Sequence, residues 1–342
     1  MSATGLKYCP GTLAEGFNTY STTCLHRVFQ GRKVSHVLPY APPQSNEEDA
    51  EKFIENRKRI SISGVQEKLS LVLEKNKLRL TKKGEQGTYL LKPIPRDVKN
   101  VDQVPANEHL TMQIARQVYG LQTAENALIF FSNGEPAYIT KRFDVKEDGS
   151  LPAGQAGKWG KEDFATLAGK TEENAGQYFK YDFNYEKMGE LLKKYVPAWR
   201  VEIEKLYSLI VFNYLFSNGD AHLKNYALLE TSGRDYVLSP AYDLLNTKIH
   251  VDDTDFALDG GLFTDGFQSE AMKKSTHPGL HDFQELAKRF EMNEKRRDKI
   301  LNPYLQSQSM IEELTRRSFL NEKTKRAFLL HYQTKRNQLN SL

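Results

Sequence analysis

The sequence predicts an α+β protein of two lobes, with a β-rich N-lobe and a mainly helical C-lobe. Three observations support this prediction. Short runs in which apolar and polar residues alternate dominate residues 61–143, as they do in half-buried strands. Apolar residues at helical spacing dominate after residue 150, and a charged, glycine-containing stretch at 145–150 separates the two textures. Two lobes with a connector favour a cleft, which is the usual place for a small-molecule site.

The chain divides by composition into three expected parts. Residues 1–60 form an N-terminal arm, since they lack clear periodicity and contain four prolines. A charged run at 46–59 predicts a short helix over 47–57 at the end of this arm. The N-lobe then covers residues 61–150, and the C-lobe covers residues 151–342.

Each N-lobe element follows from a local pattern. One helix is expected over 107–120, because Leu110, Ile114 and Val118 recur at helical spacing and Gly120 is a suitable stop. The turn at 132–135 contains Asn-Gly, a strong hairpin signal. The expected strands are 69–73, 78–80, 89–92, 127–131 and 137–140.

The C-lobe is expected to contain seven helices and one hairpin. Apolar residues at helical spacing support each helix, and Ser232 and Gly233 supply the turn of the hairpin. The expected helices are 161–168, 185–195, 201–218, 281–291, 296–304, 308–317 and 321–338. The expected hairpin strands are 226–229 and 236–238.

Composition and charge exclude several classes of protein. Of the 342 residues, 39% are hydrophobic and 11% are aromatic, which fits a folded globular chain rather than a disordered one. The net charge of +4 is smaller than a dedicated DNA-binding domain usually carries. The longest apolar run, residues 206–216, is about half as long as a membrane span. No secretory signal begins the chain, so we expect a soluble, cytoplasmic protein that makes no membrane contact.

The strongest chemical signal is the loop at residues 217–225, followed by a further carboxylate. Phosphoryl transfer needs one carboxylate that accepts or orients the attacking hydroxyl, and oxygen ligands for magnesium. Asp220 precedes Asn225 by five residues, and Asp243 follows after a predicted hairpin. Protein kinases use this order and spacing. The alternative is a polar loop in which Asp220 caps a helix and Asp243 lies in a turn after Pro240.

Two N-lobe residues extend the pattern of a phosphoryl-transfer site. Lys92 ends a predicted strand, and Glu108 opens the helix expected in that lobe. Such a lysine would neutralise phosphates, and the glutamate would orient it. An isolated lysine at a strand end is usually a solvated charge, and Glu108 could equally be a first-turn partner of the helix dipole. Residues 61–68 hold one glycine, so they match neither a Walker A loop nor a kinase glycine-rich loop.

Taken together, the motifs resemble those of HipA-like kinases, the toxin halves of bacterial toxin–antitoxin systems. Residues 61–68 are similar to the phosphate loop of that family, and the resemblance runs in order over residues 55–335. The further motifs that carry it are Leu90-Leu91-Lys92-Pro93, Asn107-Glu108, Lys141-Arg142-Phe143-Asp144, Glu162-Asp163, the loop at 220–225 and Pro240-Ala241-Tyr242-Asp243.

The resemblance implies a two-lobed, protein-kinase-like fold related to the phosphoinositide kinases, with ATP and Mg as cofactors. Asp220 would be the catalytic base, and Asn225 and Asp243 would be the metal ligands. Residues 140–143 would form the hinge beside adenine. His222 would line the nucleotide site, although a loop histidine with satisfied hydrogen bonds is the alternative. The residues expected around the nucleotide are Ser63, Gly64, Val65, Gln66, Lys92, Lys141, Phe143, His222 and Lys224.

The resemblance also implies regulation by autophosphorylation. Members of the family phosphorylate a serine of their own phosphate loop; Ser61 is the direct match and Ser63 is a second candidate. About two added negative charges at a triphosphate site would repel ATP. The Ser-x-Ser pair, together with the absence of the extra N-terminal subdomain of full-length HipA, resembles the HipT kinase of three-gene HipBST systems.

The same resemblance implies partners. These would be HipS-like and HipB-like antitoxin proteins and an aminoacyl-tRNA synthetase substrate, with the tryptophanyl enzyme implied by the likeness to HipT. DNA would be reached only indirectly, through the antitoxin. Some short relatives carry four cysteines that look like a zinc knuckle, whereas Cys9, Cys24 and His26 fall short of a tetrahedral set. We therefore expect no zinc.

Two alternative functions stay open. A small-molecule or lipid kinase on a related fold would have a similar catalytic loop, and autophosphorylation would argue against it. A non-catalytic corepressor that binds a DNA-bound antitoxin would fit the basic residues at 295–297 and 316–317. Those charges fit a solvated helix face equally well.

Overall fold

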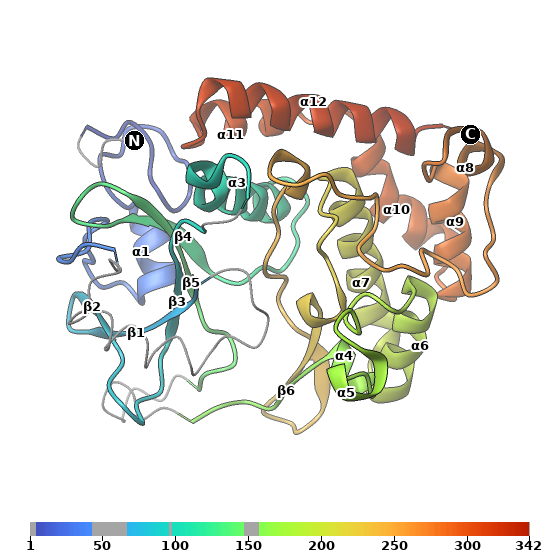
Figure 1. The fold of residues 1–342 in the computed structure, drawn as a ribbon, viewed down its shortest axis with the longest axis horizontal. Helices are drawn as coiled ribbons and strands as arrows, with labels where there is room; N and C mark the ends of the chain where they lie inside the picture. The colour runs from blue at the N-terminus through green and yellow to red at the C-terminus, as the bar shows by residue number, and fades with distance from the viewer. Residues whose placement is uncertain (1–4, 43–66, 96–97, 147–156, 342) are drawn as a thin grey trace. The chain divides into compact units, whose positions relative to one another are not determined.

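The structure, a computed structural model, describes residues 5–42, 67–95, 98–146 and 157–341 (Figure 1). The helix expected over 47–57 lies outside these residues. The chain divides into two compact units. Unit 1 contains Met1–Gln113, Ala124–Lys158 and Glu313–Lys325, and unit 2 contains Ile114–Thr123, Trp159–Glu312 and Arg326–Leu342.

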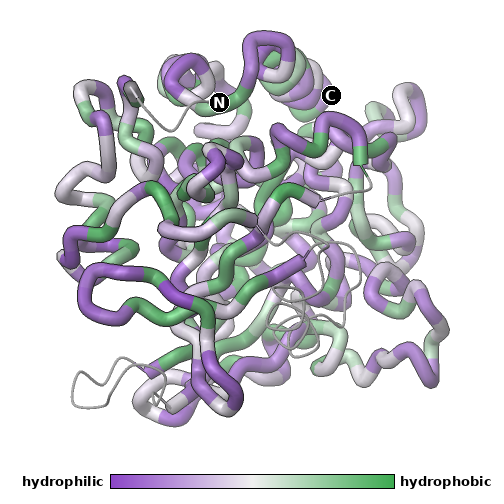
Figure 2. The backbone as a smooth tube through the Cα atoms, turned by 60° about the vertical axis from the view of Figure 1, so that its left-hand side comes forward, coloured by the Kyte–Doolittle hydropathy of each residue, from purple (hydrophilic) through white to green (hydrophobic). Residues whose placement is uncertain are grey.

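A five-stranded antiparallel sheet forms the centre of unit 1, with the strand order β2-β1-β3-β5-β4. Figure 2 shows hydrophobic stretches of backbone separated by hydrophilic ones. Each observed strand lies within one residue of its expected limits, so those predictions are confirmed. The strands are β1 (Leu69–Glu74), β2 (Lys77–Leu80), β3 (Tyr89–Lys92), β4 (Asn126–Phe130) and β5 (Pro136–Lys141).

Helix α3 (Val104–Gln117) is the helix expected over 107–120, displaced by three residues towards the N-terminus. Pro105 lies in its first turn, where a missing backbone N–H leaves no helical hydrogen bond unmade. Gly120 has a left-handed φ of 66°, and the N–H of Leu121 donates to the carbonyl of Ala115 at 2.9 Å. The left-handed glycine closes the helix end, as glycines commonly do.

The described part of the arm, residues 5–42, packs onto the sheet of unit 1. Its helix α1 (Thr22–Phe29) is capped by Ser21 and shares a buried core with β1, β3, β4 and β5. The Tyr20 hydroxyl donates to the carbonyl of Leu128 at 2.7 Å, and the Leu128 N–H donates to the carbonyl of Pro10 at 2.7 Å. These bonds use backbone groups of β4, so the arm covers the sheet beside that strand.

The two cysteines of the arm lie in a hydrogen-bonded cluster. Both are buried and reduced, and the Cys9 sulfur accepts the backbone N–H of Gly11 at 3.3 Å, of Thr12 at 3.4 Å and of Ser21 at 3.1 Å. The pKa of Cys9 is lowered to about 5, because the Cys24 thiol donates to its thiolate and outweighs the effect of burial. Among the described residues no three His, Cys, Asp or Glu side chains are grouped as metal ligands would be.

Unit 2 is built around α7, in which 11 of 17 residues are buried, with α6 and α10 packed against it. Figure 1 shows α6, α7, α9 and α10 as neighbouring helices. None of the helices in the described ranges is both long and apolar enough to cross a membrane. The helices after residue 163 are α4 (Phe164–Leu167), α5 (Glu172–Ala175), α6 (Tyr185–Tyr195), α7 (Trp199–Leu215), α8 (Glu270–Ser275), α9 (Leu280–Arg289), α10 (Glu294–Leu305), α11 (Ser309–Arg317) and α12 (Glu322–Leu339). The second half of α11 and the start of α12 belong to unit 1.

The expected helix over 161–168 is wrong in its first half. Residues Lys161–Asp163 form strand β6, which pairs with β7 (Ala227–Glu230), and β7 pairs in turn with β8 (Tyr236–Leu238). The short helix α4 begins only at Phe164, where the Asp163 side chain accepts the N–H of Thr166 at 2.9 Å. The β7–β8 hairpin itself is confirmed.

Candidate functional site

The loop that carries Asp220 is fixed by backbone geometry at the end of α7. Ser217 has a left-handed φ of 52° and turns the chain out of the helix. The N–H of Gly219 donates to the Thr247 hydroxyl at 2.9 Å. A Cβ at Gly219 would lie 2.5 Å from the Cβ of Asp253, so no larger residue fits there without movement. The sequence predicted the loop, but not these supports.

Asp220 itself is half-exposed, with 52% of its side chain accessible. The Tyr181 hydroxyl donates to its Oδ1 at 2.7 Å. His222 Nε2 lies 4.0 Å from the same oxygen, too far for a hydrogen bond. Burial lowers the pKa of His222 to about 3, with the Lys180 charge acting in the same direction. The imidazole beside Asp220 is therefore neutral at physiological pH.

The two predicted metal ligands lie side by side. Asn225 ends the 3-10 helix η2 (Leu223–Asn225), and its Nδ2 lies 3.4 Å from Asp243 Oδ2. The Asn225 Oδ1 is buried and accepts no hydrogen bond within the described part of the chain. A buried oxygen without a donor is costly, and a cation beside it would remove that cost. One amide oxygen next to one carboxylate is a donor set that suits Mg²⁺, so these residues fit the expected metal.

Asp243 occupies a strained backbone position, with a left-handed φ of 57°. Residues other than glycine seldom adopt this conformation, although asparagine and aspartate tolerate it best. The Asp243 carbonyl accepts the Asn218 side-chain N–H at 3.4 Å, which ties this residue to the loop of Asp220. Strained positions of this kind cluster at functional sites.

Lys224 is held by a carboxylate. Its Nζ lies 2.9 Å from Asp163 Oδ2, and its backbone carbonyl accepts the Tyr242 hydroxyl at 2.8 Å. Burial acts to raise the pKa of Asp163, but hydrogen bonds from Thr166 and Lys224 outweigh it and leave that pKa lowered. Asp163 therefore caps α4 and positions Lys224 at once.

In unit 1, Lys92 and Glu108 form a buried ion pair. Lys92 Nζ lies 2.7 Å from Glu108 Oε1, and their side chains are only 4% and 2% exposed. The ammonium also lies 5.4 Å from the centre of the Tyr138 ring. Lys92 is thus not a solvated charge, and Glu108 is its partner. The alternative role of Glu108 as a first-turn neighbour of the helix dipole is wrong, because α3 begins at Val104 and has no acidic residue in its first turn.

Of the remaining predicted site residues, two lie in the described part of unit 1 and five do not. Lys141 ends β5 opposite Tyr89, and Phe143 follows two residues later, half-buried. The phosphate-loop residues lie outside the described part of the chain. They are Ser61, Ser63, Gly64, Val65 and Gln66.

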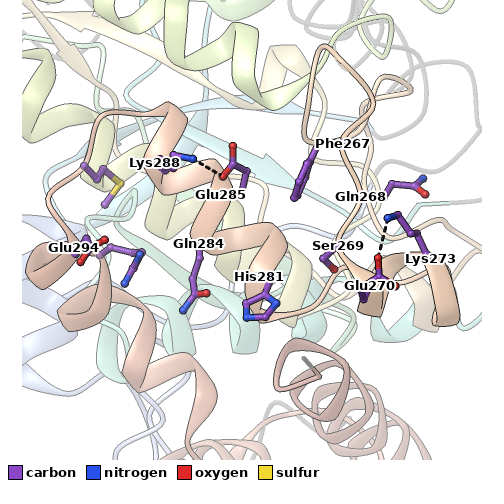
Figure 3. A pocket seen from close by; sticks show the side chains of 12 residues that line it. Phe267, Gln268, Ser269, Glu270, Lys273, His281, Gln284, Glu285, Lys288 and Glu294 are labelled. Atoms are coloured by element: carbon purple, nitrogen blue, oxygen red, sulfur yellow. Dashed lines mark hydrogen bonds and ion pairs between the residues drawn. The ribbon is translucent and has the colours of Figure 1, made fainter.

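One pocket of unit 2 lies away from these residues. A pocket of about 710 Å³ is lined by residues of α8, α9, α10 and the segment before α8, and none of the predicted site residues lines it. Figure 3 shows its lysines paired with glutamates, Lys273 with Glu270 and Lys288 with Glu285. Each of these two lysines is therefore paired with a glutamate of its own helix.

Comparison with known proteins assigns the chain to a family. Residues 60–312 match the HipA-like C-terminal domain. The chain belongs to this family. A similar protein is one of Haemophilus influenzae named "Putative kinase", 24% identical over 339 residues, which cover 96% of this chain and 94% of that protein.

Two further proteins extend the comparison. A Sinorhizobium fredii protein named "Putative kinase Y4dM" is 31% identical over 235 residues, 64% of this chain, and the match spans about half (52%) of its length. A solved structure of Shewanella oneidensis HipA, in a toxin–antitoxin complex with HipB and operator DNA, matches with a TM-score of 0.59 at 18% identity, over 87% of this chain and 72% of that one. This likeness confirms the predicted α+β, HipA-type fold.

Proposed function

We propose that the chain is an ATP- and Mg-dependent protein serine/threonine kinase that acts as the toxin of a toxin–antitoxin system. The observation that carries the proposal is that Asn225, on the loop of Asp220, lies beside Asp243 and has a buried amide oxygen with no hydrogen-bond donor among the described residues. Membership of the HipA-like family and the kinase names of its relatives support it.

In the proposed reaction a substrate hydroxyl attacks the γ-phosphorus of ATP, and the bond from that phosphorus to the β–γ bridging oxygen breaks, which releases ADP. Asp220 accepts the hydroxyl proton. Its partial exposure suits contact with a macromolecular substrate. Asn225 and Asp243 would hold Mg²⁺, which supplies positive charge to the phosphates when bound. Lys92, oriented by Glu108, would bind the phosphates.

Further residues have supporting roles in the proposal. His222 remains neutral and lines the nucleotide site without adding charge, and Lys224, fixed by Asp163, neutralises a phosphate. Lys141 and Phe143 belong to the hinge beside adenine. The phosphate loop contributes residues 63–66, and autophosphorylation of Ser61 or Ser63 would turn the kinase off by repelling ATP.

The proposed biological role follows from the family. The Shewanella HipA was solved with HipB and operator DNA, which supports a HipB-like antitoxin as partner and DNA contact through that antitoxin. A HipS-like antitoxin and a tryptophanyl-tRNA synthetase substrate follow from the likeness to HipT at Ser61 and Ser63. Inhibition of translation in the cytoplasm would be the result.

The test compares Asp220→Asn with a matched carboxylate, Asp252→Asn, in which an exposed aspartate of a neighbouring loop loses its charge. We expect wild type and Asp252→Asn to arrest growth on expression and to incorporate ³²P from γ-labelled ATP. We expect Asp220→Asn to do neither while keeping its thermal midpoint. A folded, labelled and toxic Asp220→Asn variant would refute the assignment. ATP consumption without any labelled protein would favour a small-molecule kinase.

A further inference from the structure

A tyrosine that sequence reasoning did not single out lies against the candidate catalytic base. We propose that Tyr181 is a positioning residue, which fixes the orientation of the Asp220 carboxylate for proton transfer. This inference rests on the proposed kinase function. It adds to that function a residue from the segment between α5 and α6, far from the catalytic motif in sequence.

The contact is short and directed. The Tyr181 hydroxyl donates to Asp220 Oδ1 at 2.7 Å, the usual length for a hydroxyl–oxygen hydrogen bond. A carboxylate acceptor makes this bond charge-assisted and roughly twice as strong as a neutral one. The tyrosine ring also contacts His222 edge-on, with 5.3 Å between ring centres and 76° between ring planes. Tyr181 thus touches two residues of the loop at once.

The backbone holds Tyr181 in this position. Its carbonyl accepts the N–H of Phe183 at 2.8 Å and of Asp259 at 2.9 Å. The carbonyl of Lys180 accepts the N–H of Leu223 at 3.1 Å, which joins the segment directly to the loop of Asp220. A side chain carried by a fixed backbone can orient its partner.

The hydroxyl stays a donor at every physiological pH. Burial raises the pKa of Tyr181 well above its usual value, and the carboxylates of Asp220, Asp253 and Asp259 raise it further. The groups near Asp220 include the neutral His222, the protonated Tyr181 and the Asp253 carboxylate. Tyr181 donates a hydrogen bond to Asp220, whereas His222 Nε2 is 4.0 Å away and too far to do so.

The role follows from what Asp220 would do without this bond. Its side chain is half-exposed, so water would replace the hydroxyl and the carboxylate would sample several rotamers. A base misplaced by about 1 Å costs on the order of 100-fold in rate. Loss of the hydroxyl should therefore lower the rate of the chemical step and leave ATP binding unchanged.

The test is Tyr181→Phe, which removes the hydroxyl and keeps the ring against His222. The matched control is Tyr178→Phe, three residues away in the same segment and 68% exposed. The readout is self-labelling of the full chain with γ-³²P-ATP and magnesium over a range of ATP concentrations. It yields a rate at saturating ATP and a half-saturating concentration, and thermal denaturation checks folding.

We expect Tyr181→Phe to lower the saturating rate roughly 10- to 100-fold, with the half-saturating ATP concentration and the thermal midpoint unchanged, and Tyr178→Phe to behave as wild type. If the wild type is labelled and the saturating rate of Tyr181→Phe is within twofold of it, the role of Tyr181 is overturned but the kinase function is not. A loss that appears only in the half-saturating concentration or only as a lower thermal midpoint would overturn that role too. An unlabelled wild type would overturn the kinase function, and this role with it.

Discussion

Replacing Glu108 by glutamine tests whether the Lys92–Glu108 pair is as buried as its 4% and 2% side-chain exposures indicate. Glutamine has nearly the shape of glutamate but carries no charge. The ammonium of Lys92 would therefore stay in the core of unit 1 without its counter-ion. A buried charge in this state either stays charged at high cost or loses its proton.

Two independent estimates of the free-energy cost of Glu108→Gln agree. Removing one partner of a buried ion pair costs about 3–5 kcal/mol. Deprotonating a lysine with an ordinary pKa of about 10.4 at pH 7 costs about 4.6 kcal/mol. We expect Glu108→Gln to lower the free energy of unfolding of unit 1 by about 3–5 kcal/mol. The matched control is Glu74→Gln in the sheet of unit 1, which breaks the Arg79–Glu74 pair, with 29% and 57% side-chain exposure, and should leave the free energy of unfolding nearly unchanged.

Tryptophan fluorescence would not report on unit 1, because both tryptophans, Trp159 and Trp199, belong to unit 2. The assay therefore has to follow unit 1 by another signal. Native-state hydrogen exchange, followed by mass spectrometry on peptides that cover β3 and α3, gives the opening free energy of these elements directly. The double variant Lys92→Met/Glu108→Leu should recover most of the stability, since an apolar pair of similar volume replaces both charges. An opening free energy for Glu108→Gln within about 1 kcal/mol of wild type would refute the reasoning.

Two further predictions concern backbone strain and pH. The free energy of unfolding of Asp243→Ala should be about 1 kcal/mol lower than that of Asp243→Gly, because alanine tolerates the φ of 57° poorly. Urea denaturation followed by tryptophan fluorescence measures this difference, and equal stabilities of the two variants would contradict the prediction. Burial lowers the pKa of His109 to about 4, against about 6.5 unfolded. Only the unfolded state then binds the proton between these values, so stability should fall as pH drops from about 6.5 to 4, by at most about 1.4 kcal/mol per pH unit. His109→Gln should flatten that slope in urea titrations, and an unchanged slope would contradict the role of His109.

The local sequence was sufficient to predict those elements whose secondary structure depends on a local pattern of apolar and polar residues. The strands of unit 1 alternate strongly, and each was predicted to within one residue. The neighbouring positions of Asn225 and Asp243 also followed from spacing, because a short hairpin returns the chain to the same loop. The roles of these residues stay predictions that only the activity tests can decide.

The features that were missed depend on contacts far apart in the chain. Three residues cannot show a period, so Lys161–Asp163 became a strand only through pairing with β7. Tyr181 lies in an aromatic stretch without helical or strand periodicity, and its partner Asp220 is 39 residues away. The choice between the two roles of Glu108 required knowing that it is buried beside Lys92, which no local pattern states.

The buried sulfurs of the arm make the protein convenient for site-specific labelling. The chain contains two cysteines, and Cys9 and Cys24 are 0% and 1% exposed, so maleimide dyes should spare both in the folded state. One introduced surface thiol would then carry a single fluorophore. Placed at the exposed position of Tyr178, it would report on the segment that presents Tyr181 without altering either native sulfur.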